Sequence, residues 1–443
     1  MRYYIIAGEA SGDLHGSNLM KGIYAEDPQA DIRFWGGDYM NSVWSIFQNN
    51  PSHSFGAGPD HSCCRRLLAA KVHRTVCVIA PDPCGQGGST VLKNTPHLPA
   101  GESGLVRHYK EGAVMGFVEV IAKAGRLLKN VDFCKRDILQ WKPDVVILID
   151  YPGFNFKIAE FAHKAGFKVF YYIAPKVWAS REGRIRKLRK YVDRLFIVFP
   201  FEKPYFDAKG ISYIYKGNPL VDAVDGSRAM LESRSDFLRR NELEDKPVIA
   251  MLAGSRKAEI STMMPVLTEF AKKMKSLTQY SDHQFIIAGA PSRSMKDYDP
   301  WLNEENRQYI KVLFGETQSI IRHAEAAVVN SGTASLETVL FNTPQVVGYI
   351  TNPVTYWLAR RIVKVKYISL GNLIIDRLAF NEFIQDDCNP DALVAEVREL
   401  MEDKKRREVM LSDYADIRNA LGGSGASAAV AKAMIAELTV ASK

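Results

Sequence analysis

The chain has 443 residues, of which 47% are hydrophobic and 24% charged, and its formal net charge is +8. That length exceeds what one hydrophobic core usually organises, so we expect two domains, and the positive charge favours an anionic partner. No apolar run is long enough to cross a bilayer, no signal peptide precedes the first strand, and six cysteines are too few for a disulfide framework, so we expect a cytoplasmic protein.

The first expected element is a strand over residues 3–8, which opens into a turn rich in small residues. The turn reads Gly8-Glu9-Ala-Ser-Gly-Asp13-Leu-His15-Gly16. Small residues let a ligand approach the backbone, and the free amides at a helix start favour an anion. The turn lacks the Gly-x-Gly-x-x-Gly spacing of a dinucleotide site, which counts against a nicotinamide-dependent enzyme. A second strand is expected over residues 32–37.

Residues 41–103 show no sustained helical or strand period. Histidines and cysteines crowd into this stretch among many Gly and Pro residues: His53, His61, His73, His97, Cys63, Cys64, Cys77 and Cys84. A zinc site is one interpretation, but the adjacent pair Cys63-Cys64 and the irregular spacing match no common ligand pattern. We therefore expect an unstructured insertion, and we expect that joining Met40 to Gly104 would preserve activity.

Order resumes at Gly104, and a helix is expected over residues 114–141 with a break near Asn130. The stretch Pro143-Asp-Val-Val-Ile-Leu-Ile-Asp150-Tyr-Pro-Gly-Phe-Asn155 follows, a run of branched apolar residues that stops at a carboxylate. It predicts a buried parallel strand that opens into a loop. Because the carboxyl ends of parallel strands line the ligand crevice of an open α/β sheet, Asp150 is a candidate catalytic residue. The alternative is an Asp that caps the next helix.

Further strands over residues 168–173, 195–199 and 211–215 complete a first domain, which we place at residues 1–222. A strongly basic helix follows the first of these strands and carries Ile185, Leu188 and Val192 on one stripe. Its charged face is either simply solvated or contacts an anionic membrane or phosphate. Both interpretations stay open at this point.

A second α/β domain is expected over residues 223–443, with strands over 247–252, 285–288, 310–314, 326–329 and 345–349. The turn Gly254-Ser255-Arg256 follows the first of these strands, and Ser331-Gly332-Thr333 follows the fourth. Both are strand-to-helix junctions whose small residues and free amides suit a diphosphate, and Glu337, one turn into the helix, suits a ribose. The pair Asp297 and Asp299 looks like a metal-binding Asp-x-Asp, but no strand precedes it, and we interpret it as a surface loop.

Together these motifs resemble the lipid-A-disaccharide synthase family. The matching segments are Gly8–Asp13, Val114–Gly116 with Glu119, Ile149–Asn155, Pro175–Trp178, Phe199–Glu202, Gly217–Pro219, Gly254–Arg256, Ser331–Glu337 and Tyr367–Leu373. They run in family order over nearly the whole chain outside residues 41–103. The chain departs from the family pattern at Ser180, where Trp is usual, at Asn381, where Pro is common, and in the long insertion.

The resemblance implies an α/β fold of two Rossmann-like domains facing a central cleft, the glycosyltransferase B fold. It implies transfer of 2,3-diacylglucosamine from its UDP derivative to 2,3-diacylglucosamine 1-phosphate, with inversion and without a metal or a cofactor. Asp150 is then the expected general base, with Glu9 and His15 next in line. The expected UDP-binding residues are Gly254, Ser255, Arg256, Ser331, Gly332, Thr333, Glu337 and Asn372.

The expected partners are these two substrates and an anionic membrane surface, at the inner membrane of a Gram-negative bacterium, and not a nucleic acid. The segment from Val354 to Lys366 mixes aromatic, aliphatic and basic residues, as an interfacial element would, although a core helix with a charged edge has the same composition. Self-association into a homo-oligomer stays open, and the last helices are expected to pack back on the first domain. Two other functions remain: another UDP-sugar enzyme of this fold, such as a 2-epimerase, and a non-catalytic peripheral membrane protein.

Overall fold

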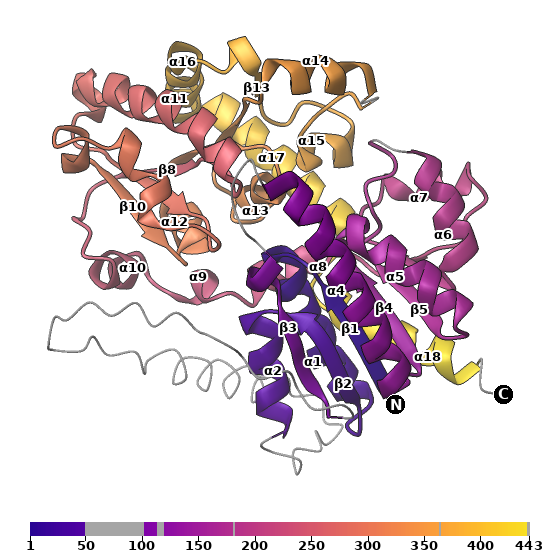
Figure 1. Cartoon of the computed structure of the whole chain (residues 1–443). Helices are drawn as coiled ribbons and strands as arrows, with labels where there is room; N and C mark the ends of the chain where they lie inside the picture. Colours follow the sequence, from indigo (N-terminus) through magenta and orange to yellow (C-terminus); the bar gives the residue numbers. More distant parts are fainter. Residues whose placement is uncertain (49–101, 113–118, 180–181, 363–364, 441–443) are drawn as a thin grey trace, which may run out of the picture. The chain divides into compact units, whose positions relative to one another are not determined.

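A computed structural model describes residues 1–48, 102–112, 119–179, 182–362 and 365–440 of the chain (Figure 1). These residues divide into two compact units, one formed by Met1–Phe170 with Ala431–Lys443 and the other by Tyr171–Val430. Residue 222, where we place the domain boundary from the sequence, lies in a helix between the last strand of one sheet and the first strand of the next. The cysteines and histidines between residues 53 and 97 lie outside the described residues.

The first sheet has seven strands in the order β3-β2-β1-β4-β5-β6-β7. They are β1 (Arg2–Ala7), β2 (Asp31–Gly36), β3 (Gly104–His108), β4 (Val145–Ile149), β5 (Lys168–Tyr172), β6 (Arg194–Ile197) and β7 (Ile214–Tyr215). The pairings of β1 with β2 and with β4 are parallel. Nearly every residue of β1, β2 and β4 is buried, as continuous branched and aromatic runs predict for a sheet covered on both faces.

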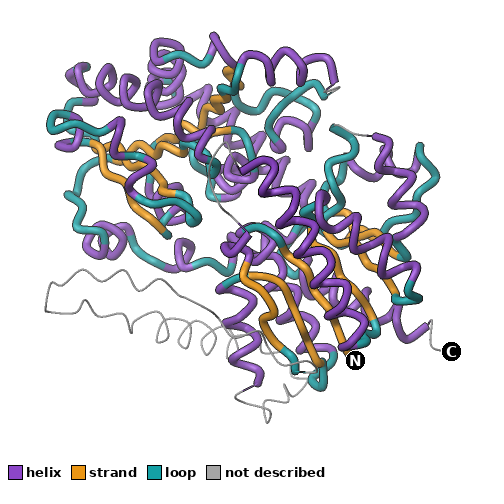
Figure 2. The backbone as a smooth tube through the Cα atoms, viewed as in Figure 1, coloured by secondary structure: helices purple, strands orange, loops and turns teal. Residues whose placement is uncertain are grey.

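The second sheet has six strands in the order β10-β9-β8-β11-β12-β13 (Figure 2). They are β8 (Val248–Leu252), β9 (Gln284–Gly289), β10 (Ile310–Phe314), β11 (Ala326–Asn330), β12 (Gln345–Tyr349) and β13 (Glu382–Ile384). The strand order repeats that of the first sheet. In each sheet the chain moves outward over three strands, returns to the middle and then moves outward on the other side. The expected α/β fold with two parallel sheets is confirmed.

Helices connect the strands in both sheets. Those of the first part of the chain are α1 (Ala10–Glu26), α2 (Asp38–Gln48), α4 (Glu119–Trp141), α5 (Pro152–Lys164), α6 (Ile185–Tyr191), α7 (Glu202–Asp207) and α8 (Pro219–Asp225). Those that follow are α9 (Arg228–Leu231), α10 (Arg234–Arg240), α11 (Lys257–Ser276), α12 (Thr317–His323), α13 (Thr333–Leu340), α14 (Pro353–Ile362), α15 (Leu370–Ile375), α16 (Pro390–Glu402), α17 (Lys404–Leu421) and α18 (Ala426–Val440).

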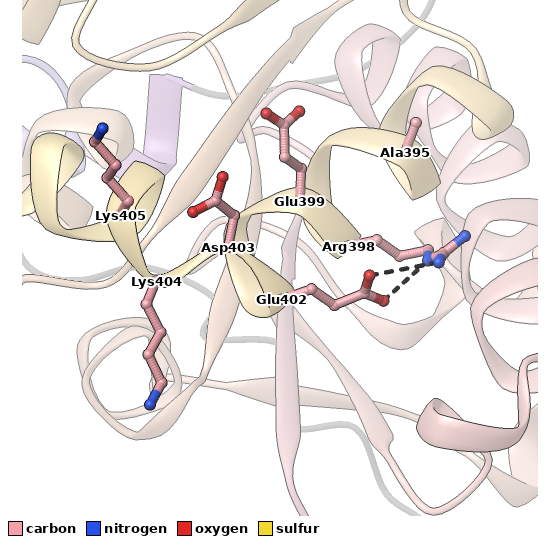
Figure 3. A pocket seen from close by; sticks show the side chains of 7 residues that line it. All are labelled: Ala395, Arg398, Glu399, Glu402, Asp403, Lys404 and Lys405. Atoms are coloured by element: carbon pink, nitrogen blue, oxygen red, sulfur yellow. Dashed lines mark hydrogen bonds and ion pairs between the residues drawn. The ribbon is translucent and has the colours of Figure 1, made fainter.

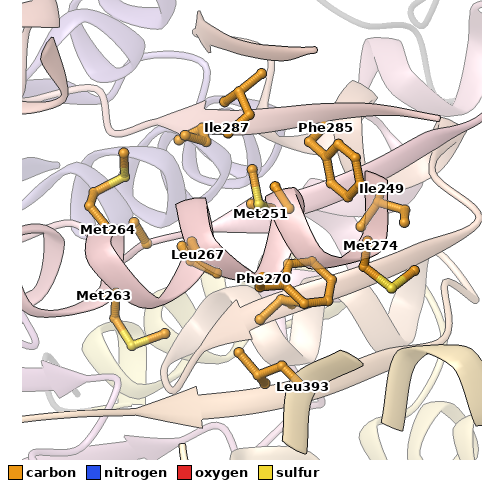
Figure 4. Packing of buried hydrophobic residues seen from close by; sticks show 14 of the residues in the cluster. Ile249, Met251, Met263, Met264, Leu267, Phe270, Met274, Phe285, Ile287 and Leu393 are labelled. Atoms are coloured by element: carbon orange, nitrogen blue, oxygen red, sulfur yellow. The ribbon is translucent and has the colours of Figure 1, made fainter. Parts of the chain in front are cut away.

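The core of the second unit forms where α11 and α16 cover one face of the sheet (Figure 4). Met263, Leu267 and Phe270 of α11 are fully buried together with Phe285 of β9 and Leu393 of α16. The apolar residues of α11 recur every three or four positions, so the helix presents one stripe to the sheet. Burying side chains of this size stabilises the fold by roughly 1.5–3 kcal/mol each.

The insertion begins later than the sequence indicates, because residues 41–48 belong to α2. Val43 is 4% exposed, and the ring of Phe47 stacks on that of Tyr24 with 4.3 Å between the centroids. The ring of Trp44 covers Gly104, whose Cβ, if it had one, would lie 2.9 Å from the indole. The expectation that Met40 can be joined directly to Gly104 is therefore wrong, since the joint would remove a packed half-helix.

The predicted break near Asn130 is also wrong, because α4 runs without interruption from Glu119 to Trp141. Asn is unfavourable inside helices because its side chain competes for backbone hydrogen bonds. Here the Arg107 guanidinium donates a hydrogen bond to Asn130 Oδ1, so the side chain has a partner away from the backbone. Strand β13 was not predicted, since it has only three residues.

Candidate active site

The first candidate site lies at the carboxyl ends of β1 and β4, where the first sheet changes direction. Strands β2 and β3 lie on one side of this point and β5 to β7 on the other. The last residues of the two central strands, Ala7 and Ile149, are paired in register. Gly8 and Asp150 therefore leave the sheet side by side, at the position where open α/β sheets bind ligands.

The turn after β4 has an unusual backbone. Asp150 and Tyr151 both have positive φ, 42° and 45°, a conformation that costs about 1–2 kcal/mol for a residue with a Cβ. The buried side chain of Asn155 supports the turn, because its Nδ2 donates to the carbonyl oxygens of Ile149 at 3.2 Å and Asp150 at 2.8 Å. Strained backbone of this kind concentrates at functional sites. The Asp150 side chain is partly exposed.

Gly8 and Tyr151 bring the two turns into contact. A Cβ on Gly8 would lie 2.3 Å from the Tyr151 ring, so only glycine fits beneath it. Burial raises the pKa of Tyr151, and the negative charge of Glu9 adds to the rise. Glu9 is exposed and forms the N-cap position of α1. The structure thus brings together two of the three candidate bases, Asp150 and Glu9, on neighbouring turns.

His15, the third candidate base, points inward with only 7% of its surface exposed. Its neighbour Asp13 is likewise a framework residue. The Asp13 carboxylate accepts hydrogen bonds from the backbone N–H groups of Gly37, Tyr39 and Met40 at 2.7–3.0 Å, at the start of α2. Burial raises the pKa of Asp13, while the three amides oppose that rise. The family motif at Gly8–Asp13 therefore combines one presented carboxylate with one that fixes α2.

The second candidate site lies at the equivalent point of the second sheet, between β8 and β11. Leu252 and Val329 are paired in register, so Ala253 and Asn330 leave the sheet together, and Asn330 Nδ2 donates to the carbonyl of Ala253 at 3.2 Å. Gly254 has φ 105°, and a Cβ there would lie 2.7 Å from Glu259. The glycine is required by both its backbone conformation and its neighbour.

Glu259 occupies the amides that the sequence analysis assigns to a diphosphate. Its Oε2 accepts from the N–H groups of Ser255 at 3.0 Å and Arg256 at 3.1 Å, and its Oε1 pairs with the Arg256 guanidinium at 2.8 Å. This is a capping arrangement at the start of α11. The Arg256 side chain is 71% exposed, so its charge remains accessible. Sequence reasoning missed Glu259, although a carboxylate three residues after a turn is the signal of such a cap.

The start of α13 differs, because no side chain caps it. Gly332 is the N-cap residue and Thr333, the first helical residue, is exposed. Ser331 Oγ donates to the carbonyl of Ile368 at 3.1 Å. Burial raises the pKa of Glu337, while a 3.2 Å hydrogen bond from Gln318 opposes the rise. The α13 start therefore offers open amides and a carboxylate one turn further along.

Asn372 faces the interior, in contrast to the other predicted UDP-binding residues. It is fully buried, its Nδ2 donates to the Phe380 carbonyl at 3.0 Å and Glu382 Oε1 at 2.8 Å, and its Oδ1 accepts from the Ala379 N–H at 2.8 Å. Glu382 also accepts from the backbone N–H groups of Ile368 and Ser369. The geometry is that of a residue that orders the loop before β13. A direct contact of Asn372 with UDP stays a prediction.

A separate hollow of about 730 Å³ lies at the junction of α16 and α17 (Figure 3). Its lining consists of Ala395, Arg398, Glu399, Glu402, Asp403, Lys404 and Lys405. Arg398 and Glu402 form an ion pair across 3.1 Å. The hollow contains none of the predicted site residues, and its charged walls suit neither acyl chains nor a sugar ring.

Two further features concern metals and membranes. Asp299 pairs with Arg307 at 2.8 Å and Asp297 caps a short turn, so both act as surface residues. Outside the gaps named above, no three His, Cys, Asp or Glu side chains are grouped as a metal site. Among the helices that the structure describes, none combines the length and the apolar composition needed to cross a membrane.

Comparisons with known proteins agree with these sites. The sequence profile of the family described as lipid-A-disaccharide synthetase matches residues 95–434. A lipid-A-disaccharide synthase of Geobacter metallireducens is 32% identical over 97% of this chain and 95% of its own length. One of Coxiella burnetii is 33% identical over 97% of this chain and 96% of its own.

Solved structures share the fold at low sequence identity. A UDP-GlcNAc 2-epimerase of Methanocaldococcus jannaschii has a TM-score of 0.61 at 14% identity, covering 98% of this chain and 99% of that one. The corresponding epimerase of Neisseria meningitidis has a TM-score of 0.57 at 12% identity, covering 99% and 100%. Identities this low establish the fold and do not distinguish an epimerase from a transferase.

Proposed function

The chain belongs to the lipid-A-disaccharide synthase family, and from that membership we propose how its own residues carry out the transfer. The family reaction joins a 2,3-diacylglucosaminyl unit from its UDP derivative to 2,3-diacylglucosamine 1-phosphate. The products are a β-1,6-linked disaccharide 1-phosphate and UDP. Inversion at the anomeric carbon corresponds to a single displacement, which needs one general base and a stabilised leaving group.

Asp150 is the proposed base. Its carboxylate takes the proton of the acceptor 6-hydroxyl while that oxygen bonds to C1 of the donor sugar and the bond from C1 to the diphosphate breaks. The observation that carries this assignment is the strained turn at the switch point of the first sheet, which presents Asp150 beside Gly8. A positioned base contributes ~10²-fold or more. Glu9, on the neighbouring turn, is the second candidate.

The leaving diphosphate is proposed to bind at the start of α13 and to the side chain of Arg256. The open amides of α13 and the exposed guanidinium support this placement. Charge that grows on the diphosphate is stabilised by such fixed donors. Glu337 is placed to accept from a ribose hydroxyl. Gly254, Ser255 and Asn372 support the site through its backbone geometry.

One assay tests the assignment of product and base together. The purified protein is incubated with UDP-2,3-diacylglucosamine and 2,3-diacylglucosamine 1-phosphate, and the products are identified by mass spectrometry. We expect a disaccharide 1-phosphate and one UDP per disaccharide from the parent and far less from Asp150→Asn. A donor epimerised at C2, with no disaccharide, would contradict the proposal.

Contact with an anionic membrane is the second part of the proposal, since both substrates carry acyl chains. On α14, Trp357 is 55% exposed and the Arg361 guanidinium lies 3.6 Å from the centre of its ring. An exposed Trp beside basic residues is typical of elements at a lipid interface. We expect the protein to co-sediment with vesicles that contain anionic lipid and to dissociate in high salt. Sedimentation that is indifferent to salt and to lipid charge would refute this.

A further inference from the structure

Three aromatic rings gather in the second unit, on the turns that follow β5 and β6. Trp178 packs edge-on against Phe201 with 4.8 Å between the ring centres, and Phe199 stacks on Phe201 at 5.2 Å with only 6° between the planes. All three side chains are partly exposed. They therefore form one continuous apolar surface, which we call the aromatic platform.

One buried carboxylate holds both turns of the platform. Glu202 is 1% exposed, and its Oε1 accepts from the Trp178 indole N–H at 3.1 Å. Its Oε2 accepts from the backbone N–H groups of Val198 and Phe199 at 3.1 and 3.0 Å. Burying a carboxylate is unfavourable unless its lone pairs are satisfied, and here three donors satisfy them. The rings are thus fixed before any ligand arrives.

A second set of hydrogen bonds supports the same turns. Asn218 Nδ2 donates to the Val198 carbonyl at 3.0 Å, and the Tyr205 hydroxyl donates to the Val177 carbonyl at 3.2 Å. The platform therefore rests on residues of three family motifs, which end at Trp178, Glu202 and Pro219. None of these residues has a role in the base or UDP assignments.

We propose that the aromatic platform binds an acyl chain of the acceptor and that Glu202 positions it. The platform lies at the carboxyl ends of strands of the first sheet, which is the end of a parallel sheet where ligands bind. UDP is assigned to the second sheet, so the first is left to the acceptor. Three joined rings cover more apolar area than one sugar face requires, and the exposed Lys176 beside them complements the acceptor's 1-phosphate. The inference rests on the proposed function.

The test measures whether the platform and the acyl chain act together. KM is determined for acceptors with long and with short acyl chains, at saturating donor and in one detergent, for the parent, Trp178→Ala and Phe201→Leu. Since each buried methylene strengthens binding, shortening the chains should raise the parent's KM ~10-fold or more. In both variants this chain-length effect should shrink towards twofold, while UDP affinity stays unchanged. Equal chain-length effects in parent and variants would overturn the proposal.

Matched controls separate a specific role from general loss of structure. Trp301→Ala alters a partly buried Trp away from the platform and should leave the chain-length effect intact. Glu202→Gln should raise the acceptor KM and leave the donor KM unchanged, whereas Glu396→Gln, at another buried carboxylate, should change neither. An acceptor KM unaffected in Glu202→Gln would remove the positioning role. If the parent makes no disaccharide with any acceptor, the proposed function itself fails, which is a distinct result.

Discussion

The two sheets share one strand order but end their central strands differently. After β4 the chain turns through two residues with positive φ and presents the Asp150 carboxylate. After β8 and β11 it enters helices, and those helix starts present N–H groups and the guanidinium of Arg256. A left-handed turn exposes an acidic side chain, whereas a helix start attracts an anion. One topology therefore supplies a base in one unit and an anion site in the other.

The same comparison separates the two helix starts of the second unit. The amides before α11 bind the unit's own Glu259, whereas no side chain caps α13. A ligand phosphate at α11 would have to displace a carboxylate that is already bound. The α13 start requires no such exchange, so it is the stronger candidate for the diphosphate.

Removing α2 should have the largest effect on the first site. A deletion of residues 41–103 removes Val43, Trp44 and Phe47, and losses of buried side chains this large cost ~3–5 kcal/mol each for the aromatic ones. We expect that variant to lose its cooperative unfolding transition. Replacement of residues 49–101 by a short Gly-Ser linker should keep both folding and activity. Equal melting temperatures for the two deletions would show that α2 contributes nothing.

Asp150→Asn should lower kcat by ~10²-fold or more, because the amide keeps the shape of the side chain but cannot take the proton. UDP affinity, measured by calorimetry, should stay unchanged. Asp144→Asn is the matched control, since Asp144 precedes the same strand at its other end and accepts from the Arg2 N–H at 2.8 Å. A parent-like kcat in Asp150→Asn would shift the role to Glu9.

Glu202 gives a pH-dependent test of the first sheet's edge. Burial raises its pKa from 4.5 to about 7, although the Phe199, Val198 and Trp178 N–H groups and Lys176 oppose the rise. Folding therefore favours the protonated form, and the stability this group contributes is present below pH 4.5 and lost as the pH rises through 7. Relative to Glu202→Gln, the parent's free energy of unfolding should fall by about 3 kcal/mol between pH 4 and 8. A constant difference in urea titrations would contradict the assignment.

Arg256→Ala and Glu337→Ala should each weaken UDP binding by ~10-fold, because each removes a charged hydrogen-bonding group from the nucleotide. Calorimetric titration with UDP measures the effect. Arg307→Ala, which removes a surface guanidinium paired with Asp299, should leave the affinity unchanged. Unaltered UDP affinity in Arg256→Ala would exclude that residue from the site.

Glu259→Ala should have the smallest effect and decides between the two helix starts. Loss of the cap should lower the free energy of unfolding by ~1 kcal/mol. If the diphosphate binds at α13, UDP affinity should stay within twofold of the parent. A tenfold gain in affinity would show that the freed amides of Ser255 and Arg256 bind the diphosphate instead.

Sequence patterns predicted the strands well because buried parallel strands are continuous apolar runs with few alternatives. They also predicted Asp150, since a carboxylate that ends such a run has a defined place in the sheet. They failed for Asn372, because a residue type that binds ligands also closes loops, and only the structure shows its partners at Phe380 and Glu382. The stripe Met40, Val43, Trp44 and Phe47 has helical spacing, but it is short and adjoins a Gly- and Pro-rich stretch. Glu202 lies among aromatic residues, where sequence gives no sign of its three donors.

The composition of the first unit has a consequence for how the protein is made. Residues 431–443 belong with Met1–Phe170, so the ribosome must synthesise residues 171–430 before that unit is complete. At usual elongation rates this takes roughly 10–50 s. During that interval the nascent first unit lacks its final helical segment, whereas the second unit is contiguous in the chain and can fold as it emerges. Release from the ribosome, rather than emergence of the first domain, therefore sets the time at which Asp150 acquires its finished surroundings.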